Sequence, residues 1–355
     1  MELAAILILT IMLTFGLCLY ARPLGELLKV MDVPTGHKQH SVATPAVGGV
    51  ILAIVGFILL VGLLPWTIHG LQHTLFVRVV ALATIIAAMV IGFIDDRRHL
   101  APTTRLVLGM ILAAVFLLLV PELQVRKLSL PSIHFYAETG ILALPFTVLC
   151  LITLKHAVNM ADGRNGLLLG MAIIWSVFFL LHALPPMIPM LVSVLGVLLV
   201  LFAFNWRGRL FMGDAGAYGL ATYAGILAIA LHRDAYGTVR TAEVVLLFLI
   251  PVLDLARLIM VRALHGLSPL APDGRHFHHL LDKKPGWKWG WLVYMLLIAV
   301  PLIVYQMFYG HGAQIIVATG LVYSLVVWAC SREPNAGSSA GPDLGETQPA
   351  YTKTR

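Results

Sequence analysis

The sequence predicts an all-α fold, a helical bundle that crosses a membrane many times, and three observations support this prediction. Of the 355 residues, 59% are hydrophobic and only 12% are charged, whereas soluble domains carry about 25% charged residues. The mean hydropathy is +0.91. Apolar runs of roughly 20 residues, the length that a helix needs to cross a bilayer, follow one another along the chain. Helices are required because lipid offers the backbone no hydrogen-bond partners.

Eleven such runs account for most of the chain, and we expect about 11 transmembrane helices. The segments between the runs are too short for a separate soluble domain. We therefore expect one transmembrane domain over residues 1–330 and a disordered cytoplasmic tail over 331–355, which is rich in Gly, Ser, Pro and Thr. The predicted spans are residues 3–21, 47–65, 75–94, 106–120, 141–158, 166–183, 187–204, 215–231, 244–261, 291–308 and 314–330.

Positive charge is distributed unevenly between the two sets of connecting segments. Nineteen of the 24 Lys and Arg residues fall in one set, and cytoplasmic loops of membrane proteins carry the excess of these residues. This places the N-terminus outside and the C-terminus in the cytoplasm. It also explains most of the net charge of +7 without a nucleic-acid partner. The inside segments are 22–46, 95–105, 155–165, 205–213, 257–289 and 331–355.

Acidic residues gather at the inner mouths of the spans, where charge is costly and usually functional. Asp95 and Asp96 end one apolar span side by side, so their carboxylates repel each other unless a cation sits between them. That arrangement suits a divalent metal or a catalytic base. The alternative is a solvated helix end that Arg97 and Arg98 neutralise.

A second polar motif places an oxygen-bearing side chain at every third residue, Asn159, Asp162 and Asn165. These positions share one face if the segment is helical, although Gly163 and Gly166 indicate a broken or tight backbone. Oxygen-rich loops with glycines suit hard cations and nucleotide recognition. A plain polar turn is the alternative.

Two further residues are candidates for contacts with phosphate or metal. Asp214 stands at the start of the eighth span, between Gly213 and Gly216, and glycine permits close approach of the backbone to such a ligand. This short pattern is weak on its own. Lys38, in the first inside loop, is either a clamp for a phosphate or an interfacial lysine that extends its amine to water.

Three histidines, His276, His278 and His279, follow Arg275 in the longest inside loop. Zinc is one interpretation, but no cysteine is nearby and the spacing is unusual for a closed zinc site. Hydrogen bonds to phosphate oxygens are favoured instead. Together the motifs offer metal-binding oxygens, a lysine and imidazoles at one inner mouth, a set that suits phosphoryl chemistry with Mg²⁺.

On these motifs, taken in this order, the sequence resembles the polyprenyl-phosphate N-acetylhexosamine-1-phosphate transferases of glycosyltransferase family 4, and within them the WecA-like branch. The matching stretches are Asn159–Gly166, Phe211–Gly216 and Ser268–Leu280. The resemblance implies a multi-pass enzyme of a bacterial inner membrane with its active site on the cytoplasmic face. It would transfer an N-acetylhexosamine-1-phosphate, in the first instance GlcNAc-1-phosphate, from a UDP-sugar to undecaprenyl phosphate. UMP would leave, and a surface polysaccharide such as O-antigen would begin; the resemblance leaves open whether the enzyme is a homodimer.

The resemblance also implies roles for the residues named above. Asp95 and Asp96 would orient or deprotonate the lipid phosphate, with Asp95 as the favoured base. Lys38 would contact the transferred phosphate, and Asp162 would act from the nucleotide side. The metal, Mg²⁺ or alternatively Mn²⁺, would be held by Asp214, Asp95 and Asn159. The substrate-binding residues would be Asn159, Asn165, Gly213, Arg275, His276, His278 and His279.

Departures from the family pattern leave alternatives open. The family commonly has Asp where Asn165 stands, Arg at His37 and Ser at Ala217. Asn165 offers a uracil edge both a donor and an acceptor but cannot act as a base, so an altered donor sugar or lost activity is one alternative. A transporter or flippase is another, for which Asp254, inside the ninth predicted span, is the candidate charge at the bilayer midplane. A helix-packing role is the other interpretation of Asp254.

Overall fold

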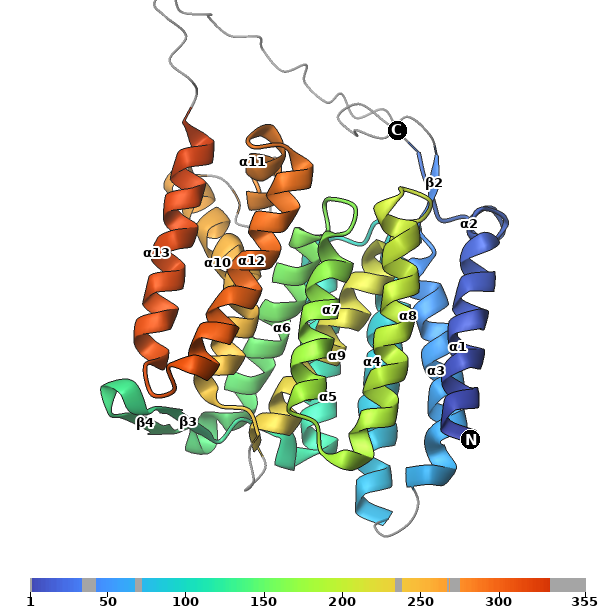
Figure 1. Cartoon of the computed structure of the whole chain (residues 1–355), viewed down its shortest axis with the longest axis horizontal. Helices are drawn as coiled ribbons and strands as arrows, with labels where there is room; N and C mark the ends of the chain where they lie inside the picture. Colours follow the sequence, from blue (N-terminus) through green and yellow to red (C-terminus); the bar gives the residue numbers. More distant parts are fainter. Residues whose placement is uncertain are drawn as a thin grey trace, which may run out of the picture.

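The computed structural model describes residues 2–33, 43–67, 72–233, 238–266, 268 and 275–332. Within this part of the chain, thirteen α-helices form one bundle whose long helices run roughly side by side (Figure 1). Each of the predicted apolar runs is a helix, and the all-α fold is confirmed. The long helices are α1 (Glu2–Leu19), α3 (Gly48–Thr67), α4 (Gln72–Arg98), α5 (Pro102–Leu119), α6 (Ala143–Ala161), α7 (Leu167–Leu181), α8 (Ile188–Trp206), α9 (Gly213–Arg233), α10 (Thr241–Leu264), α12 (Trp287–Met307) and α13 (Gly312–Ser331).

Not every one of these helices is long enough to span a membrane by itself. In the described residues, eight pass a test of length and apolarity, and a ninth span results if α1 and the short helix α2 (Ala21–Leu28), bent by 67°, are counted as one. The described apolar part of α3, Gly48–Leu59, and α7 are shorter. At 1.5 Å per residue the 15 residues of α7 cover only about 22 Å. Most of its side chains are buried among other helices, so α7 is a core helix of a multi-pass membrane protein.

Helix α9 is the centre of the bundle, with 83% of its most apolar stretch buried. It packs extensively against α4 because small residues allow close approach of the helix backbones. A Cβ on Gly92 of α4 would collide with the backbone of Asp214, and one on Gly49 of α3 would collide with the backbone of Gly216. These contacts fix the end of α4 beside the beginning of α9.

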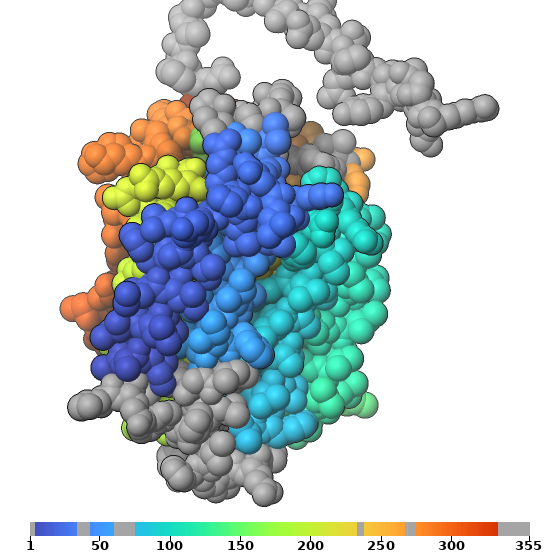
Figure 2. Space-filling model, turned by 90° about the vertical axis from the view of Figure 1, so that its right-hand side faces the viewer, coloured from blue at the N-terminus to red at the C-terminus, as the bar shows by residue number. Residues whose placement is uncertain are grey.

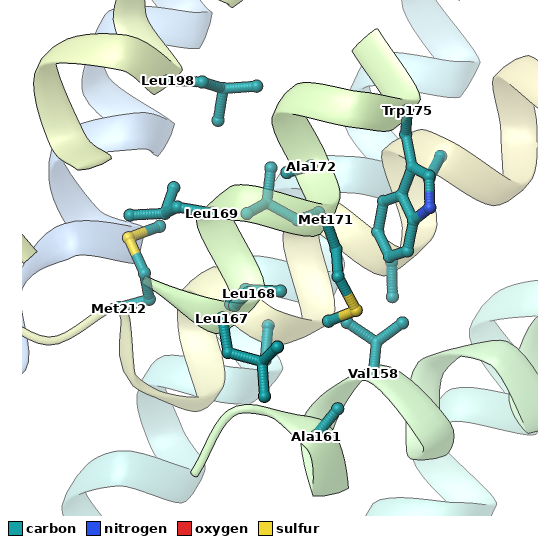
Figure 3. Close-up of a cluster of buried hydrophobic side chains, with 14 of the residues drawn as sticks. Val158, Ala161, Leu167, Leu168, Leu169, Met171, Ala172, Trp175, Leu198 and Met212 are labelled. Carbon is teal, nitrogen blue, oxygen red and sulfur yellow. The ribbon is translucent and has the colours of Figure 1, made fainter. Parts of the chain in front are cut away.

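The apolar core and the lipid-facing surface are separate. Figure 3 shows side chains of α7, among them Leu167, Leu168 and Trp175, packed together with Val158 of α6 and Leu198 of α8. Large apolar side chains also lie exposed on the outside of the bundle, over helices α1, α3, α4 and α5, which lie side by side in Figure 2. An exposed apolar surface of this extent is expected where lipid, not water, surrounds the helices.

The remaining elements lie at the two ends of the bundle. Strands β3 (Lys127–Leu130) and β4 (Phe135–Glu138) form an antiparallel hairpin at one end. Strands β1 (Met31–Asp32) and β2 (Thr44–Pro45) pair at the other end, beside α2. The helix α11 (Phe277–Lys283) lies at that same end, farther from them (Figure 1). The sequence did not predict these strands. Lys38 and most of the predicted tail 331–355 lie outside the described residues.

Candidate active site

A cavity of about 830 Å³ lies at the end of the bundle where α4 stops and α9 starts. Its walls come from segments far apart in the sequence, including the α2–β1 connection, the α6–α7 loop and the start of α12. Of the residues predicted from sequence, seven line it: Asp96, Asn159, Asp162, Asn165, Gly213, Asp214 and His279. Asp95, Arg275, His276 and His278 are not part of the lining among the described residues.

Asp96 ties the end of α4 to the first turn of α9. Its Oδ1 accepts a hydrogen bond from the backbone N–H of Asp214 at 2.8 Å, and its Oδ2 accepts one from Ala215 at 3.1 Å. Backbone N–H groups at a helix start lack partners within their own helix and favour a negative charge. Gly213 makes the contact possible, because its φ is +66° and a Cβ there would lie 2.6 Å from Asp96 Oδ2. Asp96 and Asp214 are thereby held side by side on the cavity wall.

Asp95 points away from the cavity into packed protein. Its side chain is fully buried, and its Oδ2 lies 3.0 Å from Arg105 Nε of α5 and accepts a hydrogen bond from the Tyr218 hydroxyl of α9 at 2.8 Å. Its Oδ1 accepts the backbone N–H of Leu100 at 2.9 Å. The negative charge of Asp95 acts on the neighbouring Asp214. Successive residues of a helix point about 100° apart. Asp96 can therefore face the cavity while the adjacent Asp95 faces packed protein.

The α6–α7 loop is a rigid wall of the cavity. Helix α6 ends at Ala161, so Asn159 belongs to its last turn while Asp162 and Asn165 stand in the turn that follows; the broken backbone indicated by the glycines is confirmed. The Trp287 indole N–H donates to the carbonyl of Asn165 at 3.0 Å, and that of Trp291 donates to the carbonyl of Gly166 at 2.9 Å.

Asn205 of α8 holds the same loop from the other side. Its Oδ1 accepts the backbone N–H of Gly166 at 2.6 Å, and its Nδ2 donates to the carbonyl of Leu210 at 2.9 Å. Sequence reasoning missed Asn205, Trp287 and Trp291. The two tryptophans are four residues apart, on one face of α12, but aromatic residues at a span end are usually assigned to the membrane interface.

The carboxyl group of Asp162 has unusual surroundings at this wall. Burial raises its pKa from the ordinary value to about 7, and the negative charge of Asp96 raises it further in the same direction. Next to it, Arg164 forms an ion pair with Asp282 of α11. Asp162 is therefore close to half protonated at neutral pH when no cation is bound.

The three histidines are at the start of α11, and only His279 reaches the cavity lining. His278 is buried and packs on Gly163, where a Cβ would collide with the imidazole. The rings of His278 and His279 lie 4.2 Å apart. Burial and the neighbouring imidazoles lower the pKa of both residues, which favours neutral rings.

Asp254 fastens this histidine helix to the bundle. It accepts hydrogen bonds from Arg257 Nη2 at 2.6 Å, from the Tyr323 hydroxyl of α13 at 3.0 Å and from the backbone N–H of Phe277 at 3.1 Å. His276 Nδ1 lies 3.6 Å from the same carboxylate. Asp254 is thus fully engaged in helix packing, the second of the two roles considered for it.

Metal-binding capacity follows from the oxygens of the cavity wall. No three His, Cys, Asp or Glu side chains are placed to share one metal ion in the part of the chain that the structure describes. Magnesium rarely needs such a cage, since it is usually held by one or two carboxylates together with water and substrate phosphates. Asp96 and Asp214, which are tied together at the start of α9, and Asn159, which lines the same cavity, fit that smaller requirement.

Fold and cavity together define a class of protein, a multi-pass membrane enzyme whose acidic pocket lies at one end of a helical bundle. Residues 78–232, which contain Asp95, Asp96, Asp162 and Asp214, match the family model described as glycosyl transferase family 4. The matched region is less than half of the chain, and together with the relatives below it indicates an enzyme of the phosphosugar transferase type.

Curated relatives match well beyond that region. A probable undecaprenyl-phosphate N-acetylglucosaminyl 1-phosphate transferase of Bacillus subtilis is 26% identical over 261 residues, which are 71% of this chain and 69% of the relative. A decaprenyl-phosphate N-acetylglucosaminephosphotransferase of Mycobacterium tuberculosis is 26% identical over 307 residues, 79% of this chain and 76% of the relative. A phospho-N-acetylmuramoyl-pentapeptide-transferase of Lactobacillus acidophilus is 28% identical over 214 residues, 56% of this chain and 65% of the relative.

Proposed function

We propose that the protein transfers an N-acetylhexosamine-1-phosphate, in the first instance GlcNAc-1-phosphate, from a UDP-sugar to undecaprenyl phosphate and releases UMP. One observation carries this proposal: Asp96, Asp162 and Asp214, from three separate segments, line a single cavity at one end of the bundle. The name of the relative from Bacillus subtilis supports the acceptor and the sugar. The charge distribution supports a cytoplasmic site in a bacterial inner membrane, where the product would begin a surface polymer such as O-antigen.

The reaction exchanges one phosphoryl bond for another. An oxygen of the lipid phosphate attacks the phosphorus that carries the sugar, and the bond from this phosphorus to the bridging oxygen of the UDP-sugar breaks. The bridging oxygen leaves with UMP, and the lipid gains a diphosphate that bears the sugar. Little of this chemistry needs covalent help from protein, because positioning and neutralisation of charge do most of the work.

Magnesium is the metal that we propose for this site. Asp214 and Asp96 would hold it together with Asn159, and it would neutralise the diphosphate and the departing UMP. Mn²⁺ has similar ligand preferences and is the alternative. The ordered hydrogen bonds of Asp96 to the first turn of α9 fix where these oxygens stand before any substrate arrives.

The geometry divides the work of the paired aspartates. Asp96 lines the cavity, so it is the residue that we propose to orient the lipid phosphate and take its proton. Asp95, which the sequence favoured as the base, is occupied by Arg105, Tyr218 and the backbone of Leu100. Its role in this proposal is a fixed negative charge behind Asp214. This proposal moves the base role from Asp95, which the sequence favoured, to Asp96. The role of Lys38 stays a prediction.

The parts of the cavity lined by the α6–α7 loop and by His279 would receive the nucleotide and the diphosphate. Asn165 lines the cavity, and its amide can pair with a uracil edge. His279, kept neutral by burial and by His276, can donate one hydrogen bond to a phosphate oxygen. Arg97, which also lines the cavity, adds positive charge at the rim.

The test is direct turnover. Purified protein receives undecaprenyl phosphate, Mg²⁺ and, in parallel, UDP-GlcNAc, UDP-GalNAc or a UDP-deoxyamino sugar, and UMP is measured. We expect UMP from at least UDP-GlcNAc, its loss with EDTA, and its loss in Asp214→Asn. Glu138→Gln, an exposed carboxylate of the β3–β4 hairpin, is the matched control and should stay active. Absence of UMP with every donor would refute the proposal and favour a silent family member or a lipid transporter.

A further inference from the structure

A lysine buried among the membrane-spanning helices has no role in the proposed reaction. Lys155 belongs to α6, inside the candidate span Gly140–Ala161, and only 6% of the residue is exposed. An ionised side chain in such a place is costly unless protein groups compensate it, and it is usually functional. Its surroundings therefore indicate what it is for.

Lys155 makes two close contacts, one with α5 and one with α9. Its Nζ donates a hydrogen bond to the backbone carbonyl of Arg105 at 3.0 Å, and it lies 4.4 Å from the centroid of the Tyr218 ring, within the range of a cation–π interaction. Gly109 makes room for it, because a Cβ there would lie 2.7 Å from Nζ. The amine also lines a small cavity of about 30 Å³, space for about one or two water molecules.

Both contacts lead to the same carboxylate oxygen. Arg105 and Tyr218 are the two side chains that bind Asp95 Oδ2, at 3.0 and 2.8 Å. Arg105 Nε also donates to the carbonyl of Leu100 at 2.8 Å, while the N–H of Leu100 donates to Asp95 Oδ1. Lys155 thus contacts two residues that bind Asp95, although it makes no hydrogen bond to Asp95 itself.

The electrostatic interactions of Lys155 also connect it to Asp95 and Asp214. Three carboxylates, Asp95, Asp96 and Asp214, lie next to one another at the end of α4 and the start of α9. The positive charge of Lys155 acts on Asp95 and on Asp214. In a region of low dielectric constant, such charges interact strongly over several ångströms.

We propose that Lys155 is a positioning residue for the phosphosugar transfer: its amine braces the Arg105 backbone and the Tyr218 ring, and so holds Asp95 behind Asp214. This inference rests on the proposed function. A displacement of reacting groups by about 1 Å can slow an enzyme about 100-fold. Loss of the amine should therefore slow turnover and leave the binding of the nucleotide, at the α6–α7 loop, unchanged.

The experiment compares Lys155→Met with Lys127→Met, a lysine of the exposed hairpin β3–β4, in the UMP assay. We expect kcat of Lys155→Met to fall about 10- to 100-fold with KM for the UDP-sugar within about twofold of wild type, and Lys127→Met to match wild type. A kcat of Lys155→Met equal to that of wild type, or a loss confined to KM, would overturn the inference. Lys155→Gln takes its place if the methionine variant does not fold.

A double-mutant cycle separates positioning from simple packing. If Lys155 acts through Tyr218, then Lys155→Met should cost kcat much less in a Tyr218→Phe background than alone; additive losses would contradict the inference. A wild-type protein that releases no UMP would refute the proposed function instead. In that case the same cycle, read as melting temperatures, decides whether Lys155 and Tyr218 are coupled.

Discussion

Two buried aspartates of this protein are bound in nearly the same way and serve different parts of the site. Asp95 forms an ion pair with Arg105 and accepts hydrogen bonds from the Tyr218 hydroxyl and the backbone N–H of Leu100. Asp254 accepts the same three kinds of donor, from Arg257, Tyr323 and Phe277. Each aspartate with its three partners is called an anchor here. The Asp95 anchor joins α4, α5 and α9, and the Asp254 anchor joins α10, α11 and α13.

The difference lies in what surrounds each anchor. Asp95 stands beside two more carboxylates, Asp96 and Asp214, next to the cavity. Asp254 stands among cationic and imidazole groups, Arg257 and His276, and holds the histidine helix against the bundle. One arrangement of donors thus serves once to fix negative charge at the proposed reaction centre and once to fasten a wall of the cavity. A buried carboxylate alone does not reveal which of these it does.

The largest expected effect comes from removing the charge of Asp95. In Asp95→Asn, Arg105 and Lys155 lose their anionic partner, and breaking a buried ion pair costs about 3–5 kcal/mol. We expect turnover to fall about 100-fold or more, since charge at the reaction centre is usually the largest catalytic contribution. UMP release and the melting temperature of the purified variant measure the two effects. An Asp95→Asn enzyme with wild-type turnover would show that this anchor is purely structural.

The matching change at the second anchor should be milder. In Asp254→Asn, Arg257 keeps some access to solvent, with 19% of its side chain exposed, so we expect a turnover loss of about tenfold through a displaced histidine helix. Hydrogen exchange of α11 amides should become faster, because the backbone N–H of Phe277 loses its anionic acceptor. Unchanged exchange in α11, or faster exchange that spreads equally to α4, would contradict the assignment of Asp254 as its anchor.

The two tyrosines provide a matched pair of smaller changes. Tyr218→Phe and Tyr323→Phe each remove one hydrogen bond to a buried carboxylate, worth about 1.5–3 kcal/mol, and Tyr323→Phe also removes the acceptor of a bond from Arg257 Nε. We expect a loss of thermal stability in both, at least as large in Tyr323→Phe, but a clear loss of kcat only in Tyr218→Phe. If both variants lose kcat equally, the distinction drawn between the two anchors is wrong.

Hydropathy and charge were enough to predict the helices, because a membrane forces every backbone group into helical hydrogen bonds. The motifs also predicted seven of the residues that line the cavity, since Asp96, Asp162 and Asp214 carry their chemistry in short local patterns. The sequence could not predict which of Asp95 and Asp96 faces the cavity, because this depends on how α4 is rotated against Arg105 and Tyr218.

The groups that hold the site were hidden for a related reason. The partners of the α6–α7 loop are 39, 122 and 125 residues away from it, and they bind its backbone, which leaves no trace in the loop sequence. In the sequence, Lys155 counted only as one basic residue of the inside segment 155–165, and the positive-inside pattern accounted for it. Side chains that act through a backbone carbonyl, as Lys155 and Trp287 do, need coordinates to be found.

A third carboxylate, Asp162, is the contrast to both anchors, because burial and the charge of Asp96 raise its pKa to about 7 and no guanidinium or hydroxyl contact offsets them in the described chain. Between its ordinary pKa near 4 and pH 7, the folded protein binds a proton that the unfolded chain does not. That contribution to stability is present in acid and is lost as the pH rises through 7. In EDTA, the melting temperature of wild type relative to Asp162→Asn, whose amide does not titrate, should therefore fall by a few degrees between pH 6 and pH 8. A difference that stays constant over this range would mean that Asp162 is already ionised, and would place it with the anchored carboxylates.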